Sequence, residues 1–362
     1  MGEFVQLARQ SIIDETNSIV GYELFHRDEN GIAVDFSLKR RTLSAQVILS
    51  VYNLIGRERT VENKLAFYNI DPDFLNTDIL EALPAEQCVF ELNSTMQFTQ
   101  NIIAKIKYLF ESGYTFALDN FIVSPASSIL LKDVLPYIKY LKVDAQSNDP
   151  EYVKEHIATF LKDHIAIAHK IETLDEFSAY KEMGFTLFEG FYIHRPEPVK
   201  HYRLEPKHMG VTRIYKMLDA VPMADFSKEF ERHNELSIQL LQYLISADKK
   251  KYDATSSVRQ LVHSLGKEAM KKWLMLIVYA KGSSENDKPK NNFSRFLEQR
   301  IDLMKAIVSN IHSADPGKRE DELKLLALFS TLVDIYQVPY DRLTETFDLS
   351  KNIELWLSYK KG

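Results

Sequence analysis

The sequence predicts an α/β domain followed by an all-α domain, with the α/β part forming a TIM-like (β/α) barrel. Through about the first 200 residues, apolar runs of strand length alternate with amphipathic segments of helical length. This alternation is typical of parallel strands joined by helical crossovers. The number of units favours a closed or nearly closed barrel over an open sheet. From Val211 onward, apolar residues recur at helical intervals and strand signals are scarce, which predicts a helical domain.

The composition is that of an ordinary soluble protein. The 362 residues are 45% apolar and 27% charged, so the chain can bury a sizeable core, and its length predicts roughly two or three domains. A net charge of −6 gives no reason to expect a nucleic-acid or membrane partner, since both favour basic patches. Cys88 is the single cysteine, and no apolar run resembles a signal peptide or a membrane span. We therefore expect a cytoplasmic protein without an internal disulfide.

The first two strands, Phe4–Ile13 and Val20–Phe25, are expected to pair antiparallel, because only a turn over Asp14–Ser18 separates them. A helix is expected over Leu38–Leu54. The repeated units then follow in this order: strand Leu65–Ile70, helix Pro72–Leu83, strand Cys88–Leu92, helix Met96–Ser112, strand Thr115–Leu118, strand Tyr137–Val143, helix Pro150–Leu161, strand Ile165–Ala168, helix Leu174–Met183 and strand Thr186–Ile193.

The alternation stops at His194–Gly210, whose prolines and basic residues are typical of an interdomain connection. We therefore predict a barrel domain over residues 1–198 and a helical domain over residues 199–362, with a linker at about 194–210. Within the helical half, Lys281–Asn292 predicts an exposed loop. Helices are expected after it at Phe293–His312, Arg319–Tyr336 and Pro339–Phe347.

Many of the predicted strands end at a polar or charged residue. The clearest case is Phe116–Phe121, where an apolar run stops at Asp119. The other such residues are Asn69, Glu91, Lys142, Asp144, His169 and Glu172. Parallel sheets and barrels place their sites at the carboxyl ends of the strands. We therefore expect these polar groups to gather at one end of the barrel.

In their order along the chain, these strand ends resemble EAL domains, the barrel-like phosphodiesterases that hydrolyse the bacterial second messenger cyclic di-GMP. Segment Gly21–Arg27 lies where the family has its Glu-Ala-Leu signature followed by an Arg, and only Glu23 is retained literally. The remaining matches are Asn69 with the metal-binding Asn, Glu91 with the next metal ligand, Asp119 with the first of two paired aspartates, Lys142–Asp144 with the Lys-x-Asp strand, and Ile171–Thr173 with the end of the Glu-Gly-Val-Glu-Thr motif.

The resemblance implies a cation site and a substrate site. Carboxylates and an amide oxygen suit a hard cation, which lowers the pKa of a bound water and neutralises charge on phosphoryl oxygens. By resemblance, a Mg²⁺ or Mn²⁺ ion would be held by Glu23, Asn69, Glu91 and Asp119. Arg27 would contact a substrate phosphate, and Lys142 and Glu172 would be catalytic, with Lys142 orienting the attacking water.

Several positions depart from the family pattern. The second aspartate is Asn120, the usual general base is His169 instead of Glu, the late Gln is Glu189, and the Glu that anchors the glycine-rich loop is Ser94. That loop is replaced by Phe121–Pro125, which lacks the backbone freedom of glycine. A His base is chemically feasible. The departures nevertheless favour a degenerate domain that keeps one cation site and is weak or inactive as an enzyme.

The helical half resembles an HDOD domain, a relative of HD phosphohydrolases that is associated with signalling and protein contacts. The resemblance rests on Phe230–Leu241, Ser257–Gly266 and Trp273–Leu276. No His-Asp pair occurs anywhere in the chain, so hydrolysis by this half is not expected. The two resemblances together imply a cytoplasmic regulator of cyclic di-GMP signalling whose HDOD half binds a protein partner, and they leave a homodimer open.

Two alternatives remain open from the sequence. The first is an active cyclic di-GMP-specific phosphodiesterase that produces linear pGpG with an altered loop and base. The second is a receptor that binds cyclic di-GMP without cutting it, through Arg27 and the remaining acids.

Overall fold

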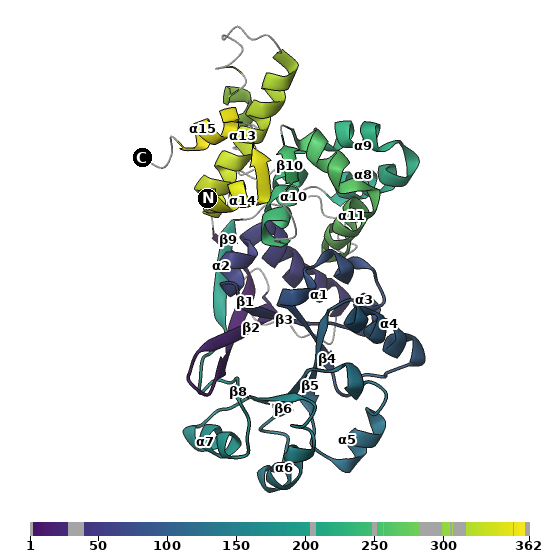
Figure 1. Ribbon diagram of the computed structural model, residues 1–362, viewed down its shortest axis with the longest axis vertical. Helices are drawn as coiled ribbons and strands as arrows, with labels where there is room; N and C mark the ends of the chain where they lie inside the picture. Colours follow the sequence, from purple (N-terminus) through teal and green to yellow (C-terminus); the bar gives the residue numbers. More distant parts are fainter. Residues whose placement is uncertain are drawn as a thin grey trace. The chain divides into compact units, whose positions relative to one another are not determined.

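The computed structural model describes residues 3–27, 40–202, 208–247, 252–255, 257–281, 299–304, 306, 316–349 and 351–358. It divides into two compact units (Figure 1). The barrel unit consists of Val5–Ile48 and Thr60–Val199, and the helical unit of Met1–Phe4, Leu49–Arg59 and Lys200–Gly362. The sequence patterns do not reveal that Leu49–Arg59 belongs to the helical unit, and the division at residue 198 stays a prediction.

The barrel unit contains a closed barrel of eight strands (Figure 1). The strands are β1 Glu3–Asp14, β2 Ile19–His26, β3 Leu65–Asn69, β4 Cys88–Asn93, β5 Thr115–Phe121, β6 Tyr140–Asp144, β7 Ile165–His169 and β8 Leu187–Phe188. Strands β2 to β8 run parallel in chain order. Strand β1 closes the barrel because it pairs antiparallel with both β2 and β8. The predicted barrel and its antiparallel first pair are confirmed.

The connections contain the α-helices α1 Arg40–Leu49, α2 Arg57–Val61, α3 Pro72–Leu75, α4 Gln100–Glu111, α5 Pro125–Leu130, α6 Pro150–His156 and α7 Leu174–Glu182. Short 3₁₀ turns complete them at η2 Ile79–Ala82, η3 Ala85–Gln87, η4 Leu135–Tyr137 and η5 Ile157–Thr159. Helices α4 to α7 lie outside the strands (Figure 1).

The helix expected over Pro72–Leu83 is wrong in its length. Helix α3 ends at Leu75, where the hydroxyl of Thr77 donates to the Phe74 carbonyl at 2.7 Å, and a separate 3₁₀ turn begins at Ile79. Short polar side chains of this kind compete for the backbone groups that a continuing helix needs.

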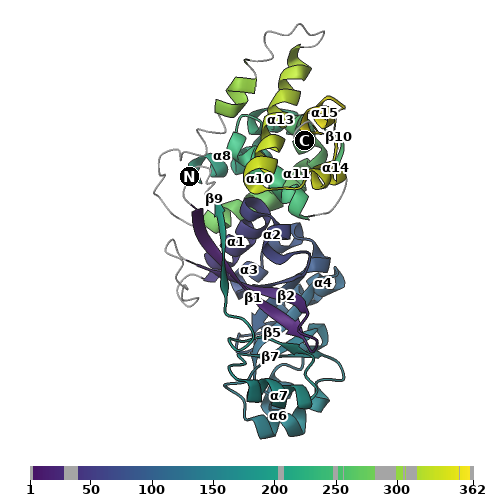
Figure 2. The ribbon, with the colours of Figure 1, turned by 90° about the vertical axis from the view of Figure 1, so that its left-hand side faces the viewer.

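The segment His194–Gly210, predicted to connect the two domains, contains a strand that the sequence patterns did not predict. Strand β9, Glu197–Tyr202, lies beside β1 (Figure 2), and the next helix begins at His208. The guanidinium of Arg9 on β1 donates to the Glu197 carboxylate at 2.6 Å. Prolines at 196 and 198 gave this strand the appearance of a loop, although an edge strand tolerates proline.

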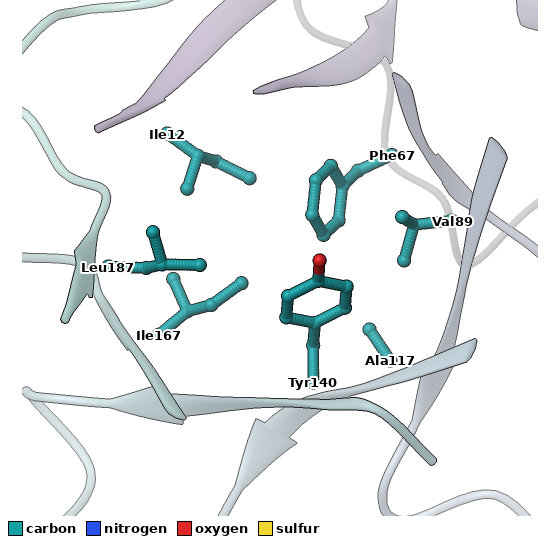
Figure 3. Close-up of a cluster of buried hydrophobic side chains, with 7 residues drawn as sticks. All are labelled: Ile12, Phe67, Val89, Ala117, Tyr140, Ile167 and Leu187. Atoms are coloured by element: carbon teal, nitrogen blue, oxygen red, sulfur yellow. The ribbon is translucent and has the colours of Figure 1, made fainter. Parts of the chain in front are cut away.

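One layer of apolar side chains fills the barrel interior (Figure 3). Its members come from seven different strands and are Ile12, Phe67, Val89, Ala117, Tyr140, Ile167 and Leu187. The rings of Phe67 and Tyr140 lie 5.5 Å apart. Since side chains alternate along a strand, the residue two positions later on each strand faces the same interior.

The helical unit contains α8 His208–Ala220, α9 Met223–Phe230, α10 Asn234–Ala247, α11 Val258–Lys281, α13 Pro316–Tyr336, α14 Tyr340–Thr346 and α15 Lys351–Ser358. A short parallel pair, β10 Tyr252–Thr255 and β11 Phe347–Leu349, was not expected. The π-helix η1, Ser50–Ile55, is buried throughout and packs on α10. The helix expected over Leu38–Leu54 is therefore α-helical only as far as Leu49 and continues as this π-helix.

Trp273 is central to the packing of this unit. It is buried, and its ring lies 5.9 Å from Phe230 and 6.4 Å from Tyr243. The expected loop over Lys281–Asn292 and most of the expected helix Phe293–His312 lie outside the described residues. Among the helices that the structure describes, none has the length and apolar character needed to cross a membrane.

Candidate functional site

Polar side chains form the next layer of the barrel above the apolar one. Each lies two positions after an interior residue of its own strand or strand end, which places it on the inward face near the carboxyl end. These residues are Asn69, Glu91, Asp119, Lys142, His169 and Glu189. Glu23 on β2 joins them and is only 3% exposed. The predicted gathering of strand-end groups is therefore what the fold produces.

The ammonium of Lys142 lies at the centre of this layer. It forms ion pairs with the carboxylates of Glu23, of Glu91 at 2.8 Å and of Glu189 at 3.1 Å. The side chains of Lys142, Glu91 and Glu189 are fully buried. One buried ammonium group thus contacts three buried carboxyl groups.

Burial and charge divide the three acids into two groups. Burial raises the pKa of Glu91 and of Glu189 well above the ordinary range. Burial acts in the same direction on Glu23, but the charges of Lys142 and then His169 outweigh it and lower the pKa of Glu23 to about 2. Burial would lower the pKa of Lys142, whereas its three carboxylate neighbours raise it. Lys142 and Glu23 therefore favour their charged forms, whereas burial disfavours the charged forms of Glu91 and Glu189.

His169 and Asp119 face one another beside this cluster. The imidazole Nδ1 of His169 lies 3.5 Å from Asp119 Oδ1, and its Nε2 lies 4.0 Å from Glu23 Oε2. Burial and then the charge of Lys142 lower the pKa of His169 to about 3, so the ring is neutral near neutral pH. Burial raises the pKa of Asp119.

Amide and hydroxyl groups hold the acids in place. The Asn69 side chain donates to Glu23 Oε1 at 2.8 Å, and the Asn120 side chain donates to Asp119 Oδ2 at 2.8 Å. The hydroxyl of Ser94 donates to the backbone carbonyl of Asn120 at 2.7 Å. Asn120 has a φ of +51°, a left-handed conformation that asparagine adopts more readily than most residues.

A cavity of about 610 Å³ opens at this end of the barrel. That volume is typical of sites for small organic ligands. The predicted site residues that line it are Glu23, Arg27, Asn69, Glu91, Asp119, Asn120, His169 and Glu172. Lys142 and Glu189 are fully buried, and Ser94 acts on the backbone next to Asp119. The structure thus brings together the residues that the sequence singled out, while their roles stay predictions.

The donor atoms fit a hard divalent cation. Glu91 Oε2, Glu189 Oε1 and Asp119 Oδ1 are buried and have no hydrogen-bond partner among the residues that the structure describes. Ligand atoms of Glu23, His169 and Glu189 all lie within 4.8 Å of one another. Sequence reasoning placed His169 at a strand end but treated Glu189 only as a departure from a pattern, and it named neither of them as a metal ligand. Their spacing of two residues after Ile167 and Leu187 was the signal that places them with the acids.

Fold and site together define a closed (β/α) barrel with acidic, amide and basic groups at the carboxyl ends of its strands. Across 363 residues the chain is 26% identical to the cyclic di-GMP phosphodiesterase CdgJ of Vibrio cholerae, covering 98% of this chain and 81% of that protein. It is 23% identical to YuxH of Bacillus subtilis, covering 96% of this chain and 85% of YuxH. The chain is thus similar along almost its whole length to a protein named as a cyclic di-GMP phosphodiesterase, which agrees with this part of the expected resemblance.

Solved structures are similar to about half of the chain. A Klebsiella pneumoniae BlrP1 calcium/cy-diGMP complex matches with a TM-score of 0.46 and 20% identity, covering 53% of this chain and 56% of that one. The matched part therefore spans little more than half the length of that solved chain. No protein-family model matches the chain.

Proposed function

We propose that this chain is a regulator of cyclic di-GMP signalling whose barrel binds cyclic di-GMP with one Mg²⁺ or Mn²⁺ ion and cleaves it slowly or not at all. The observation that carries the proposal is that Glu23, Asn69, Glu91 and Asp119 meet Arg27 at one cavity of about 610 Å³. Acidic ligands for a cation and a guanidinium for an anion are the pair of features that a phosphodiester ligand requires.

The cavity lining matches both parts of a cyclic dinucleotide. The Arg27 guanidinium is suited to a phosphate, as is a cation held by Glu23 and its neighbours. Phe25 and Phe191 also line the cavity, and aromatic rings stack on bases whatever their sequence. A bound cation would lower the pKa of its water and neutralise charge on the phosphoryl oxygens. The residues suited to the phosphates and those suited to the bases come from several different segments of the chain.

Weak turnover follows from what the chain supplies around that cation. His169 stands where the resembling family has its Glu base, and it is a neutral imidazole with a pKa of about 3. A base is most effective when its pKa lies near the working pH, so this imidazole is poorly matched to accept a proton. Asn120 adds no negative charge next to Asp119 and uses its amide to hold that carboxylate.

An active phosphodiesterase is the second candidate function. The observation that favours it is the similarity to CdgJ, a cyclic di-GMP phosphodiesterase, along 98% of this chain. The arrangement of Lys142 among three carboxylates is compatible with either outcome. It places the Lys142 ammonium close to the acids but does not identify a general base.

The experiment is a titration of the purified full chain with cyclic di-GMP in Mn²⁺ or Mg²⁺, followed by chromatography for linear pGpG. Binding without product, lost in Arg27→Ala but retained in Arg213→Ala, is the expected result. Arg213 is a matched control, since it is a guanidinium in the helical unit with 74% of its side chain exposed. Turnover that vanishes in Glu23→Ala would establish the active enzyme, and absence of both binding and turnover would contradict the proposal.

For the helical unit we propose an HDOD-type, protein-binding role. The support is the resemblance of Phe230–Leu241 and Ser257–Gly266, whose Phe230 packs on Trp273 in the core of the unit. Protein capture by the full chain, repeated with a Trp273→Ala variant, tests this role. Partners retained equally by the destabilised variant would argue against recognition by the folded helical unit.

A further inference from the structure

Lys170 forms a second centre of positive charge at the mouth of the barrel, separate from Lys142. Its ammonium lies 2.6 Å from Asp144 Oδ2 and 3.0 Å from Asn120 Oδ1. Lys170 lines the same cavity as the predicted cation ligands. Two oxygen atoms of the type that hard cations prefer therefore converge on one ammonium group.

The two oxygens are fixed by the rest of the site. Asp144 is a buried carboxylate that accepts hydrogen bonds from the backbone N–H groups of Gln146 at 2.9 Å and Ser147 at 3.1 Å, and from the Ser147 hydroxyl at 3.0 Å. Asn120 is oriented by its donation to Asp119, which leaves the amide oxygen facing Lys170. The pocket for the ammonium is thus held by backbone and side-chain contacts that do not involve Lys170.

The backbone of Lys170 is held in an unfavourable conformation. Its φ is +61°, in the left-handed region where a Cβ is disfavoured and glycine is the usual residue. Its carbonyl accepts a hydrogen bond from the Gln146 side chain at 3.1 Å, which fixes the turn. A lysine at this position therefore carries backbone strain that a glycine would avoid.

We infer that Asp144 and Asn120 form a second cation site which the tethered ammonium of Lys170 fills, so that the barrel accepts one free divalent ion and not two. This inference deepens the proposed function and rests on it for the identity of the first ion. The side chain of Lys170 is 44% exposed whereas that of Asp144 is 3% exposed, so the ammonium covers the carboxylate from the cavity side. A hard divalent cation is the ligand class that this oxygen pair takes once the ammonium is removed.

The test counts bound Mn²⁺ per chain by electron paramagnetic resonance of the full-length protein. The wild type is expected to bind one ion and Lys170→Gly to bind two at millimolar Mn²⁺. Lys170→Gln is the second neutral variant and is also expected to bind two. Lys170→Arg keeps the positive charge and is expected to bind one. The double variant Lys170→Gly with Asp144→Asn is expected to return to one, because it removes the carboxylate of the second site.

The outcomes separate this inference from the proposed function. A wild type that binds no Mn²⁺ would overturn the proposed cation site, whereas the gain of one ion in Lys170→Gly over the wild type is the quantity that tests Lys170. Equal counts in the wild type, Lys170→Gly and Lys170→Gln would overturn the inference even if the wild type binds one ion. A gain that persists in the double variant would place the second ion elsewhere and would also overturn it.

Discussion

Replacement of Lys142 by methionine tests the electrostatic centre of the barrel most sharply. Lys142→Met keeps much of the side-chain volume but removes the only ammonium that the structure shows among Glu23, Glu91 and Glu189. Three buried carboxyl groups would then face one another without a cation. Glu23 would lose the partner that allows it to remain ionised in the interior.

The expected loss of stability is about 3–5 kcal/mol, the range typical of removing one partner from a buried ion pair. The pKa of Glu23 gives an independent value. Its lowering from 4.5 to about 2 corresponds to about 3 kcal/mol in favour of the ionised form. Lys142 is the largest source of that lowering, so the two routes agree on the order of magnitude.

The assay is urea unfolding at pH 7 with a chelator, followed by circular dichroism. Lys139→Met is the matched control, because Lys139 precedes the same strand, is exposed and lies 5.3 Å from the Tyr140 ring. We expect that control to change the free energy of unfolding by less than about 1 kcal/mol. Mn²⁺ should restore part of the stability lost in Lys142→Met, since it supplies positive charge to the same acids. A loss in Lys142→Met no larger than in the control would refute this account of the cluster.

Three further predictions concern neighbouring residues. Burial lowers the pKa of His169 from 6.5 to about 3, so between these pH values the unfolded chain binds a proton that the folded chain does not. The free energy of unfolding should therefore fall as the pH drops from about 6.5 toward 3. The fall should be less steep in His169→Gln. A pH dependence unchanged by His169→Gln would count against a neutral buried ring. In Gly190→Ala the new Cβ would lie 2.1 Å from the Ile171 carbonyl oxygen, so thermal unfolding should show a loss of about 1–3 kcal/mol or more. Gly113→Ala also carries the strain of a positive φ, at +94°, but its new Cβ meets its nearest neighbour at 3.8 Å, so it should lose less. Equal losses would show that the contact is not limiting. Mn²⁺ should raise the melting temperature of the wild type more than that of Asp119→Ala, and an equal rise in both would exclude Asp119 as a ligand.

The sequence was most informative about the ends of the parallel strands. A buried strand needs an apolar run, so the point where it gives way to Asn69, Glu91 or Asp119 is visible without a structure. The antiparallel start was visible too, because a short turn leaves few other ways for two strands to pair. These local signals predicted the barrel and several of the residues that line its cavity.

Other features depend on contacts between distant segments. Glu189 follows a strand of only two residues, and its approach to Lys142 requires the barrel to close. The role of Lys170 depends on a positive φ that no periodicity reveals. The apolar segment Ser50–Ile55 continues a helical pattern, so its placement in the helical unit could not be read from spacing.

The central claim is that groups from separate strands form one cation site around Glu23. Anomalous diffraction from a crystal of the full chain soaked in Mn²⁺ measures this directly. The account predicts a single strong peak for one Mn²⁺ ion that is coordinated by Glu23. Its other ligands are expected to be oxygen or imidazole nitrogen atoms from among Asn69, Glu91, Asp119, His169 and Glu189. A barrel mouth without a peak, or a peak held by none of these residues, would contradict it.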